Sequence, residues 1–260
     1  MTETIQRHEA ELDGLPVVWR SAPGDDPPVL FLHGVPDAGE LWTPFLERIG
    51  GIAPDLPGFG ASAKRGDLDY SIEGYADWLE RFCALLGLDA VRLVMHDWGA
   101  VGLAWAQRDP ARVRRLVAID AVPFLPGYRW HPIARAWRTP LVGEVAMGMA
   151  IGPVVRRLLP PGRAAPVLAA FDPGTQRAIL RLYRASPPDV LAAAGRGLGT
   201  IDAPGLVLHG ARDRYIPARF ADGLAAALGD GRVEHVPGAG HWPWLDRPEL
   251  ILRVTDFLAF

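Results

Sequence analysis

Short runs of hydrophobic residues alternate with longer amphipathic stretches along most of the chain. Runs such as 29–32 and 91–95 end in polar or glycine turns, which is typical of strands buried on both faces of a parallel sheet. The pattern predicts eight strands: an antiparallel hairpin at 6–21, then single strands at 29–32, 51–54, 91–95, 113–119, 205–210 and 232–236. Apolar residues at helical spacing predict helices at 40–49, 71–86, 100–107, 218–228 and 248–260. The alternation of strands and helices indicates a mostly parallel sheet covered by helices on both faces.

The pattern changes between residues 123 and 200. Strand-like runs disappear there, and frequent prolines divide the segment into short helices rich in Ala, Arg and Leu. We therefore predict a core made of residues 1–122 and 201–260, and a helical cap, residues 123–200, inserted after the sixth strand. An apolar pocket is expected between the two parts, lined by Phe124, Leu125, Trp130, Trp137, Met147 and Met149.

Composition narrows the classes of function. The 260 residues are 49% hydrophobic and carry a net charge of −3, so no basic excess points to nucleic acid or to an anionic membrane surface. Cys83 is the single cysteine, the first residues lack the pattern of a signal peptide, and no apolar stretch is long enough to span a bilayer. These features predict a cytoplasmic monomer or homodimer whose partners are a small apolar substrate and water. The sequence has no metal-ligand spacing and no phosphate-binding glycine loop, which predicts neither a metal nor a cofactor.

One short sequence carries the strongest chemical signal. His96-Asp97-Trp98-Gly99 joins a buried strand to a helix. A sharp strand-to-helix turn holds one side chain above the end of the sheet, beside the free backbone N–H groups of a helix N-terminus. The side chain on this turn is the carboxylate of Asp97, which suits a nucleophile.

Further candidate groups follow other predicted strands. They are the amides after His33-Gly34, the carboxylate of Asp213 and the imidazole of His241. In an open parallel sheet, ligands bind beyond the carboxyl ends of the strands. The order acid, second acid, histidine is the Ser, Asp/Glu, His order of the α/β-hydrolase triad, with Asp97 in the place of the serine.

On these motifs, and on the D-x-P-G-x-G-x-S sequence at 55–62, the chain resembles α/β-hydrolases of the epoxide hydrolase and haloalkane dehalogenase group over nearly its whole length. The resemblance implies an α/β-hydrolase fold, with a mostly parallel eight-stranded sheet flanked by helices and a helical cap after strand 6. It also implies that Asp97 attacks an sp3 carbon and forms an alkyl ester, which a water activated by His241 then hydrolyses. The backbone N–H groups of Val35 and Trp98 would receive the oxyanion.

The identity of the triad acid stays open at this level. Asp213 would hold His241 in the right orientation, but it could instead cap a helix near Pro217. The alternative triad acid is Asp120, at the end of the strand 113–119, where some similar aspartate-nucleophile dehalogenases carry it. His33 is expected to pack and to form hydrogen bonds rather than to catalyse.

The leaving group separates the candidate reactions. An epoxide oxygen needs an O–H donor, whereas a halide needs N–H donors in a dry pocket. Tyr183, in a segment similar to the W-Y-R-N motif of epoxide hydrolases, would be the O–H donor; its usual partner is missing near Ile133, and Tyr128 is a nearby substitute. Trp98 and Trp137 would be the indole donors of a dehalogenase, the latter within a segment similar to F-R-T-P-x-V-G-E.

Two positions favour the epoxide. Val35 stands where many dehalogenases carry a donor Asn, so that Trp137 or Trp130 would have to supply the second N–H, and His96 is also closer to epoxide hydrolases. We therefore favour an epoxide hydrolase acting on a small apolar epoxide, with a haloalkane or haloacid dehalogenase as the alternative. A non-catalytic small-molecule binding protein on this fold is a distant third. His131 is a further residue of interest, because it lies among the aromatic residues of the cap.

Overall fold

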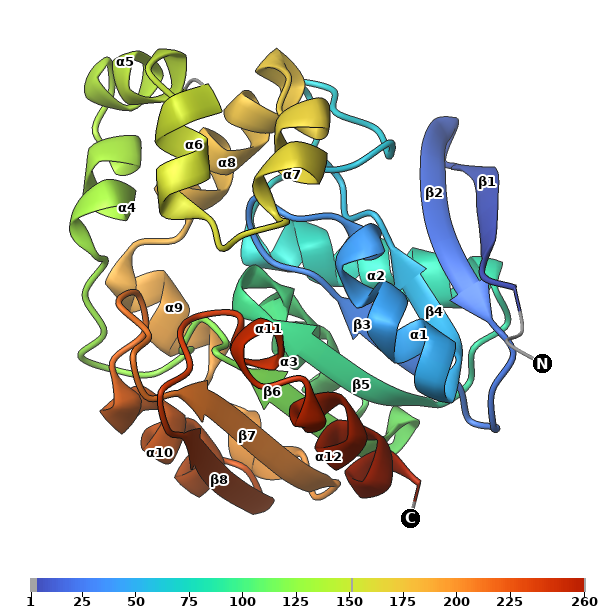
Figure 1. Cartoon of the computed structure of the whole chain (residues 1–260). Coiled ribbons are helices and arrows are strands. Elements are labelled where there is room, and N and C mark those ends of the chain that lie inside the picture. The colour runs from blue at the N-terminus through green and yellow to red at the C-terminus, as the bar shows by residue number, and fades with distance from the viewer. Residues whose placement is uncertain (1–3, 151, 260) are drawn as a thin grey trace.

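The computed structural model describes residues 4–150 and 152–259, so residues 1–3 and 260 of the predicted core and residue 151 of the predicted cap lie outside it. One eight-stranded sheet runs through the molecule in the order β1-β2-β4-β3-β5-β6-β7-β8 (Figure 1). Its strands are β1 (Gln6–Leu12), β2 (Leu15–Ala22), β3 (Val29–Leu32), β4 (Gly51–Pro54), β5 (Val91–His96), β6 (Val113–Ile119), β7 (Pro204–Gly210) and β8 (Asp230–Val236). The pairings of β2 with β1 and with β4 are antiparallel and the others are parallel. The hairpin and the mostly parallel sheet are as the sequence predicts, whereas it did not predict which strand pairs with β2.

The register of the central strands brings their carboxyl ends to one edge of the sheet. Leu32 of β3 pairs with Met95 of β5, and His96 of β5 pairs with Ile119 of β6. Ile119 in turn pairs with Leu208 of β7. The residues that follow these four strands therefore meet at the same edge, where an open parallel sheet binds its ligands.

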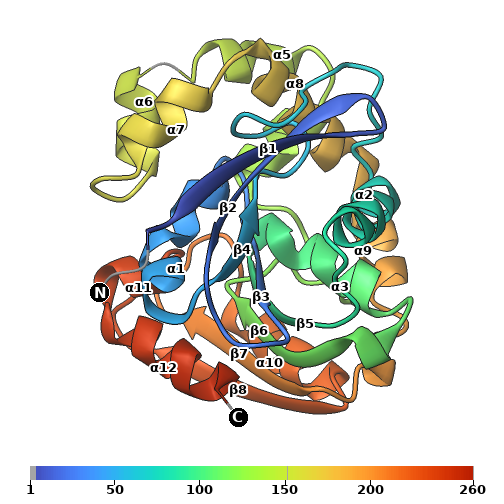
Figure 2. The same ribbon diagram turned by 90° about the vertical axis from the view of Figure 1, so that its right-hand side faces the viewer.

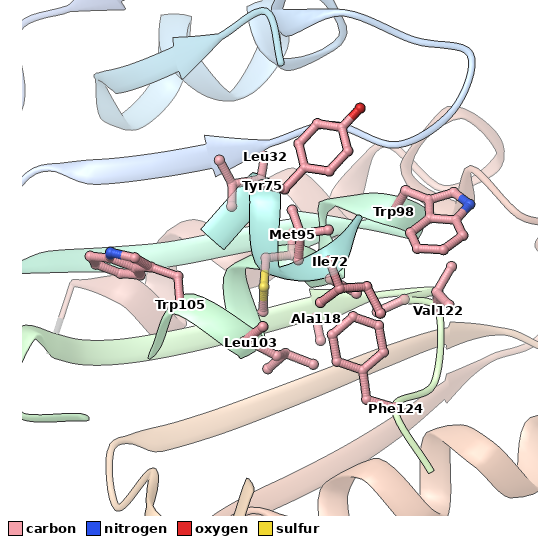
Figure 3. Packing of buried hydrophobic residues seen from close by; sticks show 14 of the residues in the cluster. Leu32, Ile72, Tyr75, Met95, Trp98, Leu103, Trp105, Ala118, Val122 and Phe124 are labelled. Carbon is pink, nitrogen blue, oxygen red and sulfur yellow. The ribbon is translucent and has the colours of Figure 1, made fainter. Parts of the chain in front are cut away.

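Helices cover both faces of the sheet, because the central strands bury both sets of side chains. Leu93 and Met95 of β5 pack into one hydrophobic cluster, while Val94 between them packs into the other. The first cluster, part of which is drawn in Figure 3, lies under α2 (Ile72–Leu85), α3 (Val101–Ala106) and α10 (Ala218–Ala227). The second lies under α1 (Thr43–Ile49), α11 (Pro243–Asp246) and α12 (Glu249–Leu258), on the opposite side of the sheet in Figure 2.

Two of the predicted α-helices begin with a turn of 3-10 helix. The predicted helix 40–49 is a 3-10 turn, η1 (Gly39–Trp42), followed by α1, and the predicted helix 100–107 is preceded by η2 (Asp97–Ala100). A third turn, η3 (Pro110–Arg112), precedes β6. In contrast, α2 begins as the sequence suggests, because the Ser71 hydroxyl accepts a hydrogen bond from the Gly74 N–H at 3.0 Å and caps the helix.

Between β6 and β7 the described chain forms only helices and loops. These are α4 (Pro132–Arg138), α5 (Val142–Gly148), α6 (Gly152–Leu158), α7 (Ala164–Ala170), α8 (Pro173–Ala185), α9 (Pro188–Ala194) and η4 (Leu198–Thr200). Helices α4 to α8 gather above the carboxyl ends of the strands in Figure 1. The domain boundaries at 122/123 and 200/201 stay a prediction. Within 4–150 and 152–259, no helix combines the length and hydrophobicity needed to cross a bilayer.

Candidate active site

The backbone at the end of β5 presents Asp97. Asp97 has a φ of 48°, in the left-handed region that side chains other than glycine seldom occupy. Two glycines make room for this turn: a Cβ on Gly34 would collide with the Asp97 side chain, and a Cβ on Gly99 would collide with the Leu32 carbonyl. The strained turn thus holds one carboxylate at the sheet edge, close against the end of β3.

The structure brings the three predicted triad residues together. His241 Nε2 lies 3.6 Å from Asp97 Oδ1, and His241 Nδ1 donates to Asp213 Oδ2 at 2.7 Å. The Val35 N–H donates to Asp97 Oδ2 at 2.9 Å. The Trp98 N–H forms no hydrogen bond to Asp97 among the described residues, so only one of the two predicted amide donors engages the carboxylate here.

The charges of these groups depend on one another. Burial acts to raise the pKa of Asp97, but the hydrogen bond and charge of His241 outweigh it and hold this pKa below its usual value. Burial acts to lower the pKa of His241, but Asp213 and Asp97 raise it well above its usual value. The two carboxylates therefore favour the protonated form of His241, and the charge of His241 favours the ionised form of Asp97.

Asp213, and not Asp120, contacts the histidine. Besides His241, Asp213 accepts hydrogen bonds from the Tyr215 N–H at 2.6 Å and the Ile216 N–H at 3.3 Å. It does not cap α10, whose preceding residue has no side-chain cap. Burial acts to raise the pKa of Asp213, but the charge and hydrogen bond of His241 outweigh it and bring this pKa to about 2. The geometry agrees with the preferred assignment of Asp213 as the acid that orients His241.

Asp120 lies behind Asp213. It is buried, has a φ of 41°, and accepts the Gly210 N–H at 3.0 Å. Burial and the neighbouring charge of Asp213 raise the pKa of Asp120 well above its usual value. Burial and the charge of Asp213 therefore both favour the neutral form of Asp120. Two carboxyl groups this close share one proton, because both cannot be ionised in a buried site.

One group of metal-ligating atoms occurs among the described residues. Asp120, His209 and Asp213 each bring one such atom within 4.8 Å of the others. These atoms already have protein partners: His209 Nε2 donates to the Ile216 carbonyl at 2.8 Å, and Asp213 accepts from His241 at 2.7 Å. A cation would have to displace these hydrogen bonds, so the set fits a proton-sharing cluster better than a metal site.

A pocket with a volume of about 90 Å³ lies between Asp97 and the cap. Trp130 and Trp137 line it, as predicted. The other four predicted lining residues do not: Phe124 and Met147 are buried within the hydrophobic cluster, Leu125 is half-buried against it, and Met149 is 65% exposed at the end of α5. The sequence could not show this, because hydrophobic residues of a cap helix pack equally well against the core or against a ligand.

The predicted leaving-group residues are not placed alike. Tyr183 and Trp137 line the pocket, with ring centroids 5.0 Å apart. Trp98 does not line it; its ring packs edge to face on Tyr183 at 5.2 Å, and its Nε1 is buried without a hydrogen-bond partner among the described residues. Trp130, the substitute donor, is engaged elsewhere, because its Nε1 donates to the Ser186 carbonyl at 2.9 Å.

The sequence does not show the roles of two buried neighbours of the site, His96 and Asp37. His96, buried before the nucleophile, donates from Nε2 to the His241 carbonyl at 2.7 Å and fixes the backbone of that residue. Asp37 is buried, accepts the Trp242 indole N–H at 2.9 Å and pairs with Arg163 of the cap. The available signals were weak: a histidine before the turn, and an acid in the loop after His33-Gly34. His33 itself is buried and accepts the Leu56 N–H at 2.9 Å, in the packing role expected for it.

Comparisons with known proteins show the family of the chain. Residues 29–254 match the model of the alpha/beta hydrolase family. A haloalkane dehalogenase from Mycolicibacterium paratuberculosis is 33% identical over 246 residues, which cover 85% of this chain and 76% of the relative. The solved structure of haloalkane dehalogenase DbeA from Bradyrhizobium elkani is 30% identical, has a TM-score of 0.84 and covers 98% of both chains.

The family also includes other chemistry. A 2-hydroxy-6-oxo-2,4-heptadienoate hydrolase from Pseudomonas putida is 30% identical over 249 residues, which cover 89% of each chain. The sheet, the inserted helices and the acid–histidine site define a hydrolase of the α/β class. The chain belongs to the α/β-hydrolase family, in its haloalkane dehalogenase-like group, and is an enzyme of that type.

Proposed function

We propose that this enzyme hydrolyses the carbon–halogen bond of a small haloalkane. The observation that carries the proposal is a carboxylate, Asp97, held on the floor of a mainly apolar pocket with one oxygen bound to an amide and the other open. The names of the similar dehalogenases support the choice of substrate. The sequence alone favours an epoxide hydrolase, which the comparisons do not confirm.

The first step uses the open oxygen of the carboxylate. Asp97 Oδ2 is held by the Val35 N–H, so Oδ1 is the oxygen that attacks the sp3 carbon. The carbon–halogen bond breaks, its electron pair leaves with the halide, and an alkyl ester forms on Asp97. Pocket-lining residues among those described include no Lys or Arg, so nothing there would bind the carboxylate of a haloacid. The haloalkane is therefore the better substrate.

The second step hydrolyses the ester. Water gives a proton to His241 Nε2 and attacks the carboxyl carbon of Asp97, and the negative charge develops on the oxygen bound by the Val35 N–H. One such donor contributes about 3 kcal/mol to barrier lowering in comparable sites. The intermediate collapses, and the alcohol takes up the proton from His241. Asp97 is then a carboxylic acid, which gives its remaining proton to His241 and on to solvent, so that the free carboxylate returns. Asp213 stabilises the transient imidazolium.

Formation of the ester also prepares the base. Asp97 loses its negative charge when it becomes an ester, and that charge is one of the causes of the raised pKa of His241. The pKa of His241 then falls, and the ring can lose its proton and accept one from water.

Epoxide hydrolysis is the second candidate, on a specific observation. The side chains of Tyr183 and Tyr128 both line the pocket. Burial raises the pKa of each hydroxyl, with a further contribution from the charge of Asp97. Both tyrosines thus stay neutral and keep the proton that an epoxide oxygen would need.

The two reactions are distinguished by their products. Wild-type enzyme incubated with small bromoalkanes is expected to release bromide and an alcohol, whereas small apolar epoxides would give a diol. His241→Gln, mixed with a bromoalkane, is expected to gain the mass of the alkyl group on the peptide that contains Asp97. Diol without bromide would move the assignment to the epoxide, and the absence of any adduct or product with both panels would favour a non-catalytic binding protein.

A further inference from the structure

The charge of the chain is divided unevenly between its two parts. Residues 123–200 contain ten arginines, no lysine and three acids, which gives them a net charge of +7. Since the whole chain carries −3, the remaining residues carry −10. The expectation that no anionic surface is a partner rested on the whole-chain charge, which hides this division. Such an asymmetry is typical of proteins that bind an anionic surface through their positive part.

Helix α5, in the positive part, is apolar on two opposite sides. Gly143 and Met147 are buried on its inner side. Leu141, Val145 and Met149 recur at every fourth residue and are 80%, 63% and 65% exposed. Hydrophobic side chains all round a helix are typical of a helix that is buried on all sides or lies in a membrane. The outer side of α5 therefore suits contact with an apolar partner.

Leu141 is held in its exposed position by a strained turn. Its φ is 67°, in the left-handed region that a branched side chain seldom adopts. The Val142 N–H donates to the Pro140 carbonyl at 2.8 Å across Leu141, which closes a γ-turn of the rare kind. Glycine would take this backbone conformation without strain. The leucine therefore does not serve the stability of the turn, and strain of this kind indicates that its side chain has a function.

Two exposed arginines follow the apolar stripe along the chain. Arg156 and Arg157 lie on α6, next to Val154, which is 42% exposed. Within 4–150 and 152–259, neither guanidinium forms a salt bridge or a hydrogen bond. In Figures 1 and 2, α5 and α6 both lie at the edge of the molecule away from the sheet. An arginine can lay its methylene groups along an apolar surface while its charged end reaches a phosphate.

We propose that this outer cap face docks on the surface of a membrane that contains anionic phospholipids. The residues of the face are Leu141, Val145, Met149, Val154, Arg156 and Arg157. The aliphatic side chains enter the boundary between headgroups and acyl chains, and the arginines bind the lipid phosphates. Nucleic acid would match the charge but offers little to exposed aliphatic side chains. An interface with a second copy favours aromatic anchors, which these six residues do not provide.

The docked position would also serve the pocket. Val155 and Leu158 of α6 line the active-site pocket, and Leu158 is at the same time 39% exposed. One helix therefore contacts both the pocket and the outer surface. A small apolar haloalkane concentrates in lipid, so docking brings the pocket close to the dissolved substrate. This benefit rests on the function proposed above, whereas the docking itself does not.

Sedimentation with lipid vesicles measures the docking. Wild type is expected to pellet with vesicles of phosphatidylcholine and phosphatidylserine in equal amounts, to stay in solution with phosphatidylcholine alone, and to be released by salt. Arg156→Gln combined with Arg157→Gln should weaken binding about 25-fold, or about fivefold for each lost charge. Arg114→Gln combined with Arg232→Gln is the matched control, because these arginines are exposed on β6 and β8 of the sheet. The control should bind like wild type.

Leu141→Gly tests the apolar part of the face. Glycine accepts the backbone of the turn, so the midpoint of thermal unfolding should not fall below that of wild type. Vesicle binding should nevertheless weaken about tenfold, because an exposed side chain that enters the lipid is lost. Leu252→Ala is the control for this variant, since Leu252 is 45% exposed on α12 of the core, and it should bind vesicles like wild type.

Other outcomes contradict the proposal. If wild type stays in solution with both kinds of vesicle, or if the two arginine variants bind equally, the outer cap face does not dock on anionic lipid. A dimer in analytical ultracentrifugation that Leu141→Gly abolishes, without vesicle binding, would make the face an interface between two copies. Release of bromide from a bromoalkane without vesicles tests the proposed function separately. Enzyme that pellets but releases no bromide retains the docking and loses the function, and active enzyme that does not pellet does the reverse.

Discussion

The two halves of this active site are built differently. On the core side, each reacting group follows a strand and is fixed by short hydrogen bonds, such as Val35 N–H to Asp97 at 2.9 Å and His241 to Asp213 at 2.7 Å. On the cap side, Tyr183, Trp137 and His131 come from short helices and contact one another mainly through ring faces and edges. The core therefore fixes the covalent chemistry, and the cap adjusts the leaving group and the substrate.

The two sides of the site should respond differently to substitution. A hydrogen-bonded carboxylate tolerates little displacement, since small shifts misalign attack and base. Aromatic side chains that contact one another by packing can be exchanged at a lower cost. Substitutions on the core side should thus abolish turnover, and substitutions on the cap side should change its rate and selectivity.

The largest expected effect is a loss of turnover that distinguishes the two buried acids, Asp213 and Asp120. Asp213→Asn removes the charge that orients and stabilises His241, and turnover should fall on the order of 10⁴-fold. Asp120→Asn keeps a neutral hydrogen-bond donor next to Asp213, and turnover should change less than about tenfold. The measurement is steady-state kcat for the preferred substrate, with circular dichroism to confirm folding. If the two variants exchange these effects, Asp120 is the triad acid and the assignment of Asp213 is wrong.

The next effect tests how the cap is attached to the core. The Asp37 side chain is fully buried and Arg163 is its charged partner from the cap, while Lys64 and Asp172 form a more exposed pair at 2.9 Å. Arg163→Met leaves the Asp37 carboxylate without that partner and should lower the free energy of unfolding by about 3 kcal/mol. Lys64→Met, the control, should cost less than about 1 kcal/mol. Urea unfolding measures both values. If the two variants lose the same free energy of unfolding, the burial of Asp37 does not add to the strength of its pair with Arg163.

A smaller effect separates the two candidate substrates. Tyr183→Phe removes a hydroxyl from the pocket and keeps the ring that packs on Trp98. Epoxide opening needs that proton, so its rate should fall on the order of 10²-fold. Carbon–halogen cleavage needs no proton and should lose less than about tenfold. A uniform loss on bromoalkanes and epoxides would mean that Tyr183 orients the substrate and does not select the leaving group.

The core was largely predictable from the sequence, for a physical reason. A strand buried on both faces must be a continuous apolar run, so residues such as Asp97 and Asp213 that follow such runs necessarily lie at the sheet edge. The order of the strands in the sheet cannot be predicted without knowing which strands pair. The carboxyl ends of parallel strands, however, lie at the same edge whatever that order is. Motif order along the chain then predicted the contacts of His241 with Asp97 and Asp213. The predicted contact of the Trp98 N–H with Asp97 does not occur among the described residues.

The cap was predictable only as a set of helices. Helical periodicity identified α8, but it could not show that Trp98 would face away from the pocket or that Met149 would face solvent. These orientations depend on how short helices pack on one another, which single-residue patterns do not encode. The place of His131 likewise depends on a single contact, in which its Nδ1 accepts the Ala134 N–H and caps α4.

The smallest effect concerns the coupling between the two steps on the core side. Since the Asp97 charge helps to raise the pKa of His241, Asp97→Asn, which mimics the neutral ester, should lower that pKa by at least about one unit, or 1.4 kcal/mol. NMR titration of the histidine ring protons, with His241→Gln to assign the signal, measures the shift. The sign follows for the reaction: ester hydrolysis requires neutral His241, so its rate rises with pH through the lowered pKa, and the ester accumulates in acid. An unchanged midpoint in Asp97→Asn would mean that Asp213 alone sets the charge of the base, and the two steps would then be independent.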